Sequence, residues 1–502
     1  MIRRVLIANR GEIARRVMRT CREMSITTVA IYSDADADAL HVQDADTAER
    51  VGPAAATESY LRIPAVIDAA RRSGADAVHP GYGFLSENAD FAQACAAAGL
   101  AFIGPPADVI RRMGSKTASR ETVSAAGVPV VPGATPASQS AADISRAVRD
   151  TGLPVLLKAA AGGGGKGMRI VRHADEIDDA VAAATSEGVR AFGDGTLYVE
   201  RLVERPRHIE VQIFGDTHGR VVHLFERDCS LQRRHQKVIE EAPAPHLAPG
   251  VRARLLDAAV QAARAVNYVN AGTVEFLLEG DGEDARFYFL EMNTRLQVEH
   301  PVTEAITGFD LVRAQILVAS GEPLPFSQAD IRVNGHAIEA RVYAEDARRL
   351  LPQAGRILAY REPAGTGVRV DAGVAAGQHV TVHYDPLLAK VIAHAPSRRE
   401  AIDSIAAALT GYDILGVRHN IAFLLALLER NEVRDGRSYT RFIEDHLDAL
   451  AAPPNASVVH SAVAVGAFAA ATAAGAEGSG AGSDDDASAQ WDPWDRLGPM
   501  AW

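Results

Sequence analysis

Two hydrophobic patterns alternate along the first 105 residues. Short apolar runs typical of strands lie at 4–8, 28–33, 76–80 and 101–105. Helices are predicted between them at 11–23, near 62–72 and near 87–98. In the first of these helices, Ile13, Val17 and Cys21 share one face. Strands that alternate with helices indicate a parallel sheet covered by helices. The turn NRGE (9–12) after the first strand lacks the GxGxxG pattern, so a dinucleotide site is not predicted.

The pattern changes at about residue 115. A compact α+β unit is predicted from a helix at 138–150, strands at 154–159 and 168–171, a helix at 174–187 and a strand at 196–200. Longer strands follow in two pairs, 208–215 with 221–228 and 272–279 with 285–292. The turn-rich GDGEDA (280–285) makes the second pair a hairpin, which would set Glu275 beside Glu291 as a carboxylate pair.

The last third of the chain has two parts. A unit at 331–447 opens with a strand-like run at 336–346 and closes with helices. Residues 452–490 are mostly Ala, Gly, Ser, Pro and Asp, which predicts a flexible linker. The terminal QWDPWDRLGPMAW either docks on this protein or opens a further domain.

Composition narrows the class of protein. The 502 residues are 47% hydrophobic and 23% charged, as in an ordinary soluble globular protein of several domains. A net charge of −12 without a basic block argues against nucleic acid as a partner. The three cysteines form no CxxC pair, so a reducing compartment is expected. The N-terminal apolar run is too short for a signal peptide, and 461–476 is too short for a membrane span. We expect a soluble, cytoplasmic protein.

The segment EMNTRLQVEHPVTE (291–304) carries a polar residue at every second position. The alternating residues are Glu291, Asn293, Arg295, Gln297 and Glu299. In an extended strand they would share one face. That face would combine carboxylates suited to Mg²⁺ with a guanidinium suited to a planar anion. A solvated edge strand of mixed charge is the alternative.

Two lysines and a glycine run are candidates for phosphate binding. In KAAAGGGGKGMR (158–169), the glycines at 162–165 allow the backbone to approach a phosphate. No Ser or Thr follows the lysine, so this is not a Walker A loop. Lys158 and Lys116 are the candidate phosphate ligands, with a flexible hairpin tip and a surface lysine as the alternatives.

The densest polar run is ERDCSLQRRHQKVIEEAPAP (226–245). Val238 and Ile239 within it indicate partial burial, where unpaired charges are costly. Cys229 is predicted to be structural rather than nucleophilic. Arg341 is flanked by apolar residues, and a salt bridge with Glu339 or Glu345 is its alternative to a functional role.

Together with IANRGEIARR (7–16), HPGYGFLSEN (79–88) and EARVYAEDA (339–347), these segments resemble the biotin carboxylase family of the ATP-grasp enzymes. The resemblance covers about 1–447 and is greatest to the α subunits of acyl-CoA carboxylases. It implies a multidomain α/β and α+β fold. The implied parts are a Rossmann-like N-terminal domain at 1–114, an ATP-grasp domain at 115–330 with a glycine-loop lid at about 131–203, a mixed α/β C-terminal domain at 331–447, and a linker with a Trp-containing tail at 448–502.

The resemblance also implies an activity and its site. The activity is ATP- and bicarbonate-dependent carboxylation of carrier-bound biotin through carboxyphosphate, the first half-reaction of an acyl-CoA carboxylase in fatty acid metabolism. The metal would be Mg²⁺, with Mn²⁺ as an alternative, and its ligands Glu275, Glu291 and Asn293. Nucleotide contacts would come from Lys116, Lys158, Gly163, Gly164, Gly165, Glu200, Arg201, Val203, His208, Gln232 and His235. Bicarbonate would be held by Lys237, Arg295, Gln297 and the backbone of Val298. Glu299 would be the general base, and Arg341 would stabilise the biotin enolate.

Partners follow from the same resemblance. Family members that carry their own biotin have an AMKM-type motif, which does not occur here. We therefore expect either a separate biotin carrier subunit or a fragment that ends after its linker. A carboxyltransferase subunit and a homodimer of this unit are further expectations, with neither nucleic acid nor membrane.

Two other functions stay open at this point. Another ATP-grasp ligase, of the carboxylate–amine or carbamoyl-phosphate type, would share the glycine loop and the carboxylate pair. RLQVEHPVTE together with RRHQK favours biotin. A non-catalytic assembly subunit is the second, and the presence of Lys237, Glu299 and Arg341 argues against it.

Overall fold

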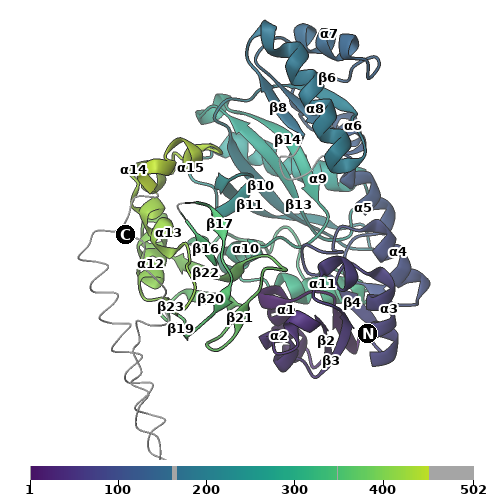
Figure 1. The fold of residues 1–502 in the computed structure, drawn as a ribbon, viewed down its shortest axis with the longest axis vertical. Coiled ribbons are helices and arrows are strands. Elements are labelled where there is room, and N and C mark those ends of the chain that lie inside the picture. Colours follow the sequence, from purple (N-terminus) through teal and green to yellow (C-terminus); the bar gives the residue numbers. More distant parts are fainter. Residues whose placement is uncertain (1, 161–166, 348, 451–502) are drawn as a thin grey trace, which may run out of the picture.

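The computed structural model describes residues 2–160, 167–347 and 349–450. Figure 1 shows the N-terminal part and the helices at 398–450 at different corners of the molecule, with a small α/β unit projecting at the top. In the described residues, no helix has both the length and the apolar character needed to cross a membrane.

The N-terminal part is a five-stranded parallel sheet in the order β3-β2-β1-β4-β5. Its strands are β1 (Arg4–Ile7), β2 (Thr27–Ser33), β3 (Thr47–Gly52), β4 (Ala77–His79) and β5 (Ala101–Phe102). Its helices are α1 (Gly11–Glu23), α2 (Leu40–Asp44), α3 (Ile63–Ser73) and α4 (Ala89–Ala97). The predicted alternation is confirmed. The sequence prediction missed β3 because TAERVG is a polar edge strand whose side chains are mostly exposed or half-buried.

The projecting unit is built around a four-stranded antiparallel sheet in the order β6-β9-β7-β8, and we call it the lid sheet. Its strands are β6 (Gly133–Ala134), β7 (Val155–Ala159), β8 (Met168–Val171) and β9 (Leu197–Arg201). The helices α7 (Ala141–Thr151) and α8 (Ile177–Phe192) bury Ile144, Val148 and Val181 against it. The helices α5 (Ala107–Gly114) and α6 (Lys116–Ala125) connect it to the N-terminal sheet. The glycine run at 162–165 lies outside the described residues.

An eight-stranded antiparallel sheet forms the centre of the molecule, in the order β14-β13-β10-β11-β12-β15-β22-β20. Its strands are β10 (Arg207–Gly215), β11 (Val221–Arg233), β12 (Gln236–Ala242), β13 (Asn270–Glu279), β14 (Arg286–Asn293), β15 (His336–Tyr343), β20 (Val368–Ala372) and β22 (Leu387–Ala395). The helices that pack near it are α9 (Pro249–Ala265), α10 (His300–Thr307) and α11 (Leu311–Ala319). The predicted β13–β14 hairpin is confirmed, with Glu275 directly opposite Glu291.

The C-terminal part packs helices against β15 and β22 of the same sheet. The helices are α12 (Arg398–Thr410), α13 (Ile421–Glu429), α14 (Asn431–Arg434), α15 (Phe442–Asp445) and α16 (Leu447–Leu450). Short strands complete it: β16 (Glu345–Asp346), β17 (Leu351–Pro352), β18 (Gly355–Arg356), β19 (Ala359–Arg361), β21 (His379–Val380) and β23 (Asp413–Leu415). Ile405, Leu424 and Val391 belong to one buried core that joins helices and sheet.

One sequence prediction about the central sheet, at the end of β14, is wrong. The alternation from Glu291 to Glu299 indicated a continuous strand, but β14 ends at Asn293 and the chain turns before α10 begins at His300. The side chains still converge because a turn, rather than a strand, carries Arg295 and Gln297 back over the sheet. The predicted linker at 452–490 and the tail lie outside the described residues, and the domain boundaries given above stay a prediction.

Candidate active site

A cavity of about 840 Å³ extends from the lid sheet to the central sheet. Its lining includes almost all the side chains singled out from the sequence. They are Lys116, Lys158, Glu200, Arg201, Val203, His208, Gln232, His235, Lys237, Glu275, Glu291, Asn293, Arg295, Gln297, Val298 and Arg341. Glu299 is fully buried behind Lys237 and Arg341. Gly163, Gly164 and Gly165 lie outside the described residues.

The ammonium group of Lys237 on β12 is the centre of the cavity floor. It contacts three carboxylates: Glu275 at 2.9 Å, Glu299 at 2.6 Å and Glu210, which also approaches it closely. Burial alone would lower the pKa of Lys237, but the three carboxylates raise it well above its usual value. The lysine therefore stays charged, and it is surrounded by more negative than positive charge.

The pKa values of the three carboxylates respond in the opposite direction. Burial would raise the pKa of Glu210, but Arg227 and Lys237 lower it to about 2. Lys237 and His208 likewise overcome burial and lower the pKa of Glu275. Burial and the nearby charge of Glu210 would raise the pKa of Glu299, but Lys237 and Arg341 outweigh them and lower it. All three are therefore ionised at neutral pH, so the floor presents fixed negative charge.

Glu275 and Glu291 differ in what surrounds them. Glu275 accepts hydrogen bonds from Asn293 at 2.8 Å and Gln297 at 3.3 Å, and Nε2 of His208 lies 2.8 Å away. Within the part of the chain that the structure describes, no donor or cation is bonded to the carboxylate of Glu291. Burial and the charge of Glu275 raise its pKa. Glu291 is thus an open carboxylate at the cavity wall, and an added cation would stabilise its ionised form.

Arg341 on β15 is held between two carboxylates. Its Nε donates to Glu240 at 2.6 Å and its Nη2 donates to Glu299 at 2.9 Å. The predicted alternative, a salt bridge with Glu339 or Glu345, is not what the structure contains. Glu345 pairs with Arg233 instead, and both carboxylate oxygens of Glu339 lack a hydrogen-bond partner. Because its two partners lie 101 and 42 residues away in the sequence, the sequence alone could not identify them.

Glu240 and Glu339 form an acidic pair in the same sheet. They are directly opposite each other on β12 and β15, and both are fully buried. Burial, opposed by Arg341 and reinforced by Glu299, raises the pKa of Glu240 to about 7. Burial raises the pKa of Glu339 well above its usual value, which favours the protonated form of this side chain. Arg341 therefore faces one permanent carboxylate, Glu299, and one that titrates near neutrality, Glu240.

The turn after β14 ties the cavity to the N-terminal part. Nε of Arg295 donates to Glu87 at 2.8 Å, while its two other nitrogens reach Gln297 at 3.1 Å and Asn293 at 3.2 Å. The carbonyl of Val298 accepts from Lys390 at 2.7 Å. An anion needs a hydrogen-bond donor, so the backbone group of Val298 that could face one is its N–H, as the resemblance implies.

Lys158 and Glu200 pair across the lid sheet. Lys158 is on β7 and Glu200 on the neighbouring β9, where their side chains form a short ion pair. Arg120 binds the same carboxylate at 2.6 Å. Lys116, at the start of α6, is half-buried, and burial lowers its pKa. Lys116 and Lys158 therefore both present a positive charge to the cavity. The charge of Lys158 is neutralised by Glu200 in this structure.

The other predicted nucleotide contacts have different surroundings. Gln232 lies 3.3 Å from Nδ1 of His208, and both are buried. His235 is exposed in the tight turn between β11 and β12, where its φ is +64°. The guanidinium of Arg201 is bound to Glu279 at 2.8 Å, and it lies 5.5 Å from the ring centre of Tyr288.

Several site residues were missed in the sequence analysis. Glu210 contacts Lys237, Glu240 contacts Arg341, and Arg227 bonds Glu210 at 2.5 Å. Partial burial was predicted for the run at 226–245, which contains Arg227 and Glu240, but no partner was predicted for either residue, and Glu210 was not singled out. Cys229 is fully buried and its pKa is raised well above the usual value, which agrees with its predicted structural role.

Family models match three successive parts of the chain. Residues 1–110 match the biotin carboxylase N-terminal domain, residues 115–327 match the ATP-binding domain of the carbamoyl-phosphate synthase L chain, and residues 339–445 match the biotin carboxylase C-terminal domain. The chain is 51% identical over 447 residues to the biotin carboxylase of Halalkalibacterium halodurans, covering 89% of this chain and 98% of that one. The chain belongs to the biotin carboxylase family.

Further comparisons of this biotin carboxylase agree. It is 53% identical over 451 residues to the mitochondrial methylcrotonoyl-CoA carboxylase α subunit of Oryza sativa subsp. japonica, covering 89% of this chain but 61% of that subunit. The chain thus spans less than two thirds of the α subunits it matches. The biotin carboxylase domain of 2-oxoglutarate carboxylase from Hydrogenobacter thermophilus, solved as a dimer with MgADP, ADP and bicarbonate, superposes with a TM-score of 0.86. It is 45% identical and covers 91% of this chain and 100% of that domain. The chain has the three-part biotin carboxylase fold.

Proposed function

We propose that this chain uses ATP and bicarbonate to carboxylate biotin attached to a carrier protein, as the first half-reaction of an acyl-CoA carboxylase. The observation that carries the proposal is the ion-pair cluster on the cavity floor, where Glu299 contacts both Lys237 and Arg341. A proton acceptor lies there between a lysine suited to an anion and an arginine suited to an enolate oxygen. The ligand-bound relative from Hydrogenobacter thermophilus supports the same substrates.

ATP would occupy the part of the cavity beneath the lid sheet. Lys116 and Lys158 would contact its phosphates, with His208, Gln232 and His235 nearby. Phosphate binding by Lys158 would release Glu200 from its present ion pair, leaving that carboxylate to accept from the adenine amino group. Arg201 and Val203 would complete the adenine pocket, and the glycines at 163–165 would cover the phosphates. A lid that closes over ATP would exclude water from a reactive phosphoanhydride.

The donor set at Glu275 and Glu291 fits Mg²⁺. The open carboxylate of Glu291, with its raised pKa, lies directly opposite Glu275, and the amide of Asn293 is adjacent. Mg²⁺ takes one or two carboxylates together with substrate phosphates and waters, and Mn²⁺ accepts the same ligands. When bound, the metal supplies positive charge against the negative charge of the triphosphate.

Bicarbonate would bind between Arg295, Gln297, the N–H of Val298 and Lys237. Glu299, ionised because of its lowered pKa, would take the hydroxyl proton while the bicarbonate oxygen attacks the γ-phosphorus and ADP leaves. The carboxyphosphate formed would break into CO₂ and phosphate. Phosphate would then accept the proton of the biotin ureido nitrogen, which attacks CO₂, while Arg341 stabilises the enolate oxygen.

The partners are part of the proposal. The biotin carrier would be a further domain or a separate subunit, with a carboxyltransferase as the second catalytic component and a homodimer of this unit as the assembly. The names of the α-subunit relatives and the dimer of the Hydrogenobacter thermophilus domain support this arrangement. We propose a cytoplasmic role in acyl-CoA metabolism, supported by the three buried free thiols of the described chain.

The test is ADP release in the presence of ATP, Mg²⁺ and bicarbonate, with and without free biotin. We expect biotin to stimulate ADP release, and Glu299→Gln to remove the stimulation. The family model shared with carbamoyl-phosphate synthase keeps an amine-dependent ligase as the second candidate. ADP release that depends on ammonia or glutamine and is indifferent to biotin would favour that candidate and contradict the proposal.

A further inference from the structure

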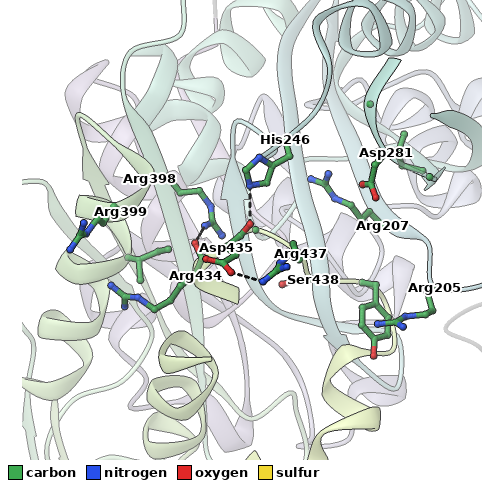
Figure 2. Close-up of a pocket in the computed structure, with 16 residues that line it drawn as sticks. Arg205, Arg207, His246, Asp281, Arg398, Arg399, Arg434, Asp435, Arg437 and Ser438 are labelled. Atoms are coloured by element: carbon green, nitrogen blue, oxygen red, sulfur yellow. Dashed lines mark hydrogen bonds and ion pairs between the residues drawn. The ribbon is translucent and has the colours of Figure 1, made fainter. Parts of the chain in front are cut away.

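A second cavity, of about 1170 Å³, adjoins the active-site cavity at Arg205, which lines both, and it contains none of the site residues described above. The loop before β10, the turn after β13, the start of α12 and the segment after α14 surround it (Figure 2). Six arginines contribute to its lining: Arg205, Arg207, Arg398, Arg399, Arg434 and Arg437. We call this cavity the arginine groove.

Two of these arginines are structural parts of the floor. Arg207 is buried and bonds Asp228 at 2.7 Å, and Arg398 bonds Glu241 at 2.7 Å. Arg398 also donates to the backbone carbonyl of Val433 at 2.7 Å. The charges of these two arginines are matched within the fold, so they are not available to a ligand.

The rim of the groove is different. Arg434 pairs with Asp403 at 2.6 Å and Arg437 with Asp435 at 2.5 Å, in contacts that are partly or largely exposed to solvent. Such surface pairs contribute little and exchange readily with other partners. Arg205 and Arg399 are exposed and take part in no ion pair among the residues that the structure covers. The rim therefore offers positive charge that the fold itself does not use.

The arrangement of the rim selects the shape of a ligand. Figure 2 shows Arg399 and Arg434 on one side of the groove and Arg205 on the other, so the guanidinium groups do not converge on one point. A single phosphate is bound best by donors that converge. Leu278, Ile402 and Tyr439 lie between the arginines but are almost fully buried, and Arg205 lies 4.1 Å from the ring centre of Tyr439. An extended acidic segment with aromatic side chains matches this rim, because carboxylates pair with guanidinium groups and rings pack on guanidinium faces.

The chain itself contains such a segment. Residues 484–495 read DDDASAQWDPWD, with five Asp, two Trp and no Lys or Arg. The described chain ends at Leu450 in α16, which packs beside α13 and α15. Since α15 begins three residues after Tyr439, the end of the described chain is close to the groove in sequence. The intervening residues can span up to about 110 Å, so length does not prevent contact.

We propose that residues 484–495 dock in the arginine groove of the same chain. The aspartates of the segment replace Asp403 as the partner of Arg434 and Asp435 as the partner of Arg437. They also pair with Arg205 and Arg399. Trp491 or Trp494 packs on an exposed guanidinium group of the rim. Covalent connection places the segment at an effective concentration of the order of millimolar, so weak individual contacts suffice. The docking does not depend on the proposed enzymatic activity.

Tryptophan fluorescence of the full chain tests this docking directly. All three Trp of the protein, at 491, 494 and 502, lie in or just after the segment, so their emission reports on it alone. We expect blue-shifted emission that acrylamide quenches weakly. In the double variant Arg399→Glu, Arg437→Glu, the blue shift should be lost and quenching should equal that of the unfolded chain. Asp484→Asn, Asp485→Asn, Asp486→Asn should weaken docking in the same direction without altering the groove.

The matched control is Arg62→Glu, Arg332→Glu, which makes the same charge change at exposed arginines elsewhere and should behave like the wild type. Wild-type emission already as exposed as in the unfolded chain would refute the docking. A blue shift that the groove variants leave intact, or that the control removes equally, would also refute it. A blue shift that disappears on dilution would assign the segment to a second copy and overturn the proposal as stated. Biotin-dependent ADP release and circular dichroism, both expected to be unchanged, establish that each variant is folded.

Discussion

The cavity floor and the arginine groove both gather charged side chains, but they treat them in opposite ways. On the floor, Lys237, Glu299 and Arg341 are buried and share partners. In the groove, Arg205 and Arg399 are exposed and unshared. A buried charge deprived of its partner is strongly destabilising, whereas an exposed charge is worth little by itself. The floor is therefore a cooperative unit, and the groove is a set of nearly independent charges that acts only when a ligand engages several of them.

The largest expected effect on activity is that of Glu299→Gln. The amide cannot accept a proton, so biotin-stimulated ADP release should fall by about 10²–10⁴-fold, the usual contribution of a general base. ATP binding, measured by calorimetry, should be nearly unchanged, because Glu299 lies behind Lys237 and Arg341 rather than in the nucleotide part of the cavity. Glu322→Gln, at an exposed position after α11, is the control. Turnover close to wild type in Glu299→Gln would exclude this carboxylate as the base.

The largest expected effect on stability is that of Lys237→Met. It leaves Glu210, Glu275 and Glu299 without their shared cation, and breaking a buried ion pair costs about 3–5 kcal/mol. The lowered pKa values of these carboxylates contribute stability above the usual glutamate range, and that contribution is lost as the pH falls. The deficit of the variant in urea unfolding should therefore be greatest near neutral pH and shrink on acidification. Lys116→Met, at a half-buried lysine of the same cavity, should destabilise far less. A deficit independent of pH would contradict the model of a cooperative floor.

The cavity floor could be predicted from the sequence in part, and the arginine groove could not. Strand and helix positions followed from periodicity, and the hairpin turn at 280–285 was sufficient to pair Glu275 with Glu291. The partners of Lys237 and Arg341 could not be predicted, because Glu210 and Glu240 reach them only once the four strands β10, β11, β12 and β15 have assembled in order. The end of β14 at Asn293 was missed, since an alternating pattern does not reveal where a strand turns. The arginine groove had no signal at all in the sequence, because its arginines come from two segments that are about 190 residues apart.

Glu240→Gln tests a smaller, pH-dependent effect. The pKa of Glu240 is raised to about 7 by burial, so its protonated form stabilises the fold below the usual glutamate pKa, and this contribution is lost as the pH rises through about 7. The neutral amide has no such titration. Between pH 5 and 7, the unfolding free energy of the wild type should fall relative to that of the variant by up to about 1.4 kcal/mol per pH unit. Parallel pH profiles would show that Glu240 is not protonated in the fold. Glu444→Gln, at the cavity edge on α15, provides the control with an unchanged slope.

The smallest expected effect is on the unfolding midpoint of a variant that lacks two arginines of the groove rim. Arg205→Ala, Arg399→Ala removes two exposed guanidinium groups that have no ion-pair partner among the described residues, so the unfolding midpoint should stay within error of the wild type. Arg207→Ala, in the floor of the same groove, removes the partner of buried Asp228 and should lower the midpoint clearly. The contrast between two sets of arginines in one cavity separates charge that the fold requires from charge that is free for a ligand. If the rim variant were as unstable as Arg207→Ala, the rim arginines would be part of the fold, and the free positive charge on which docking depends would not exist.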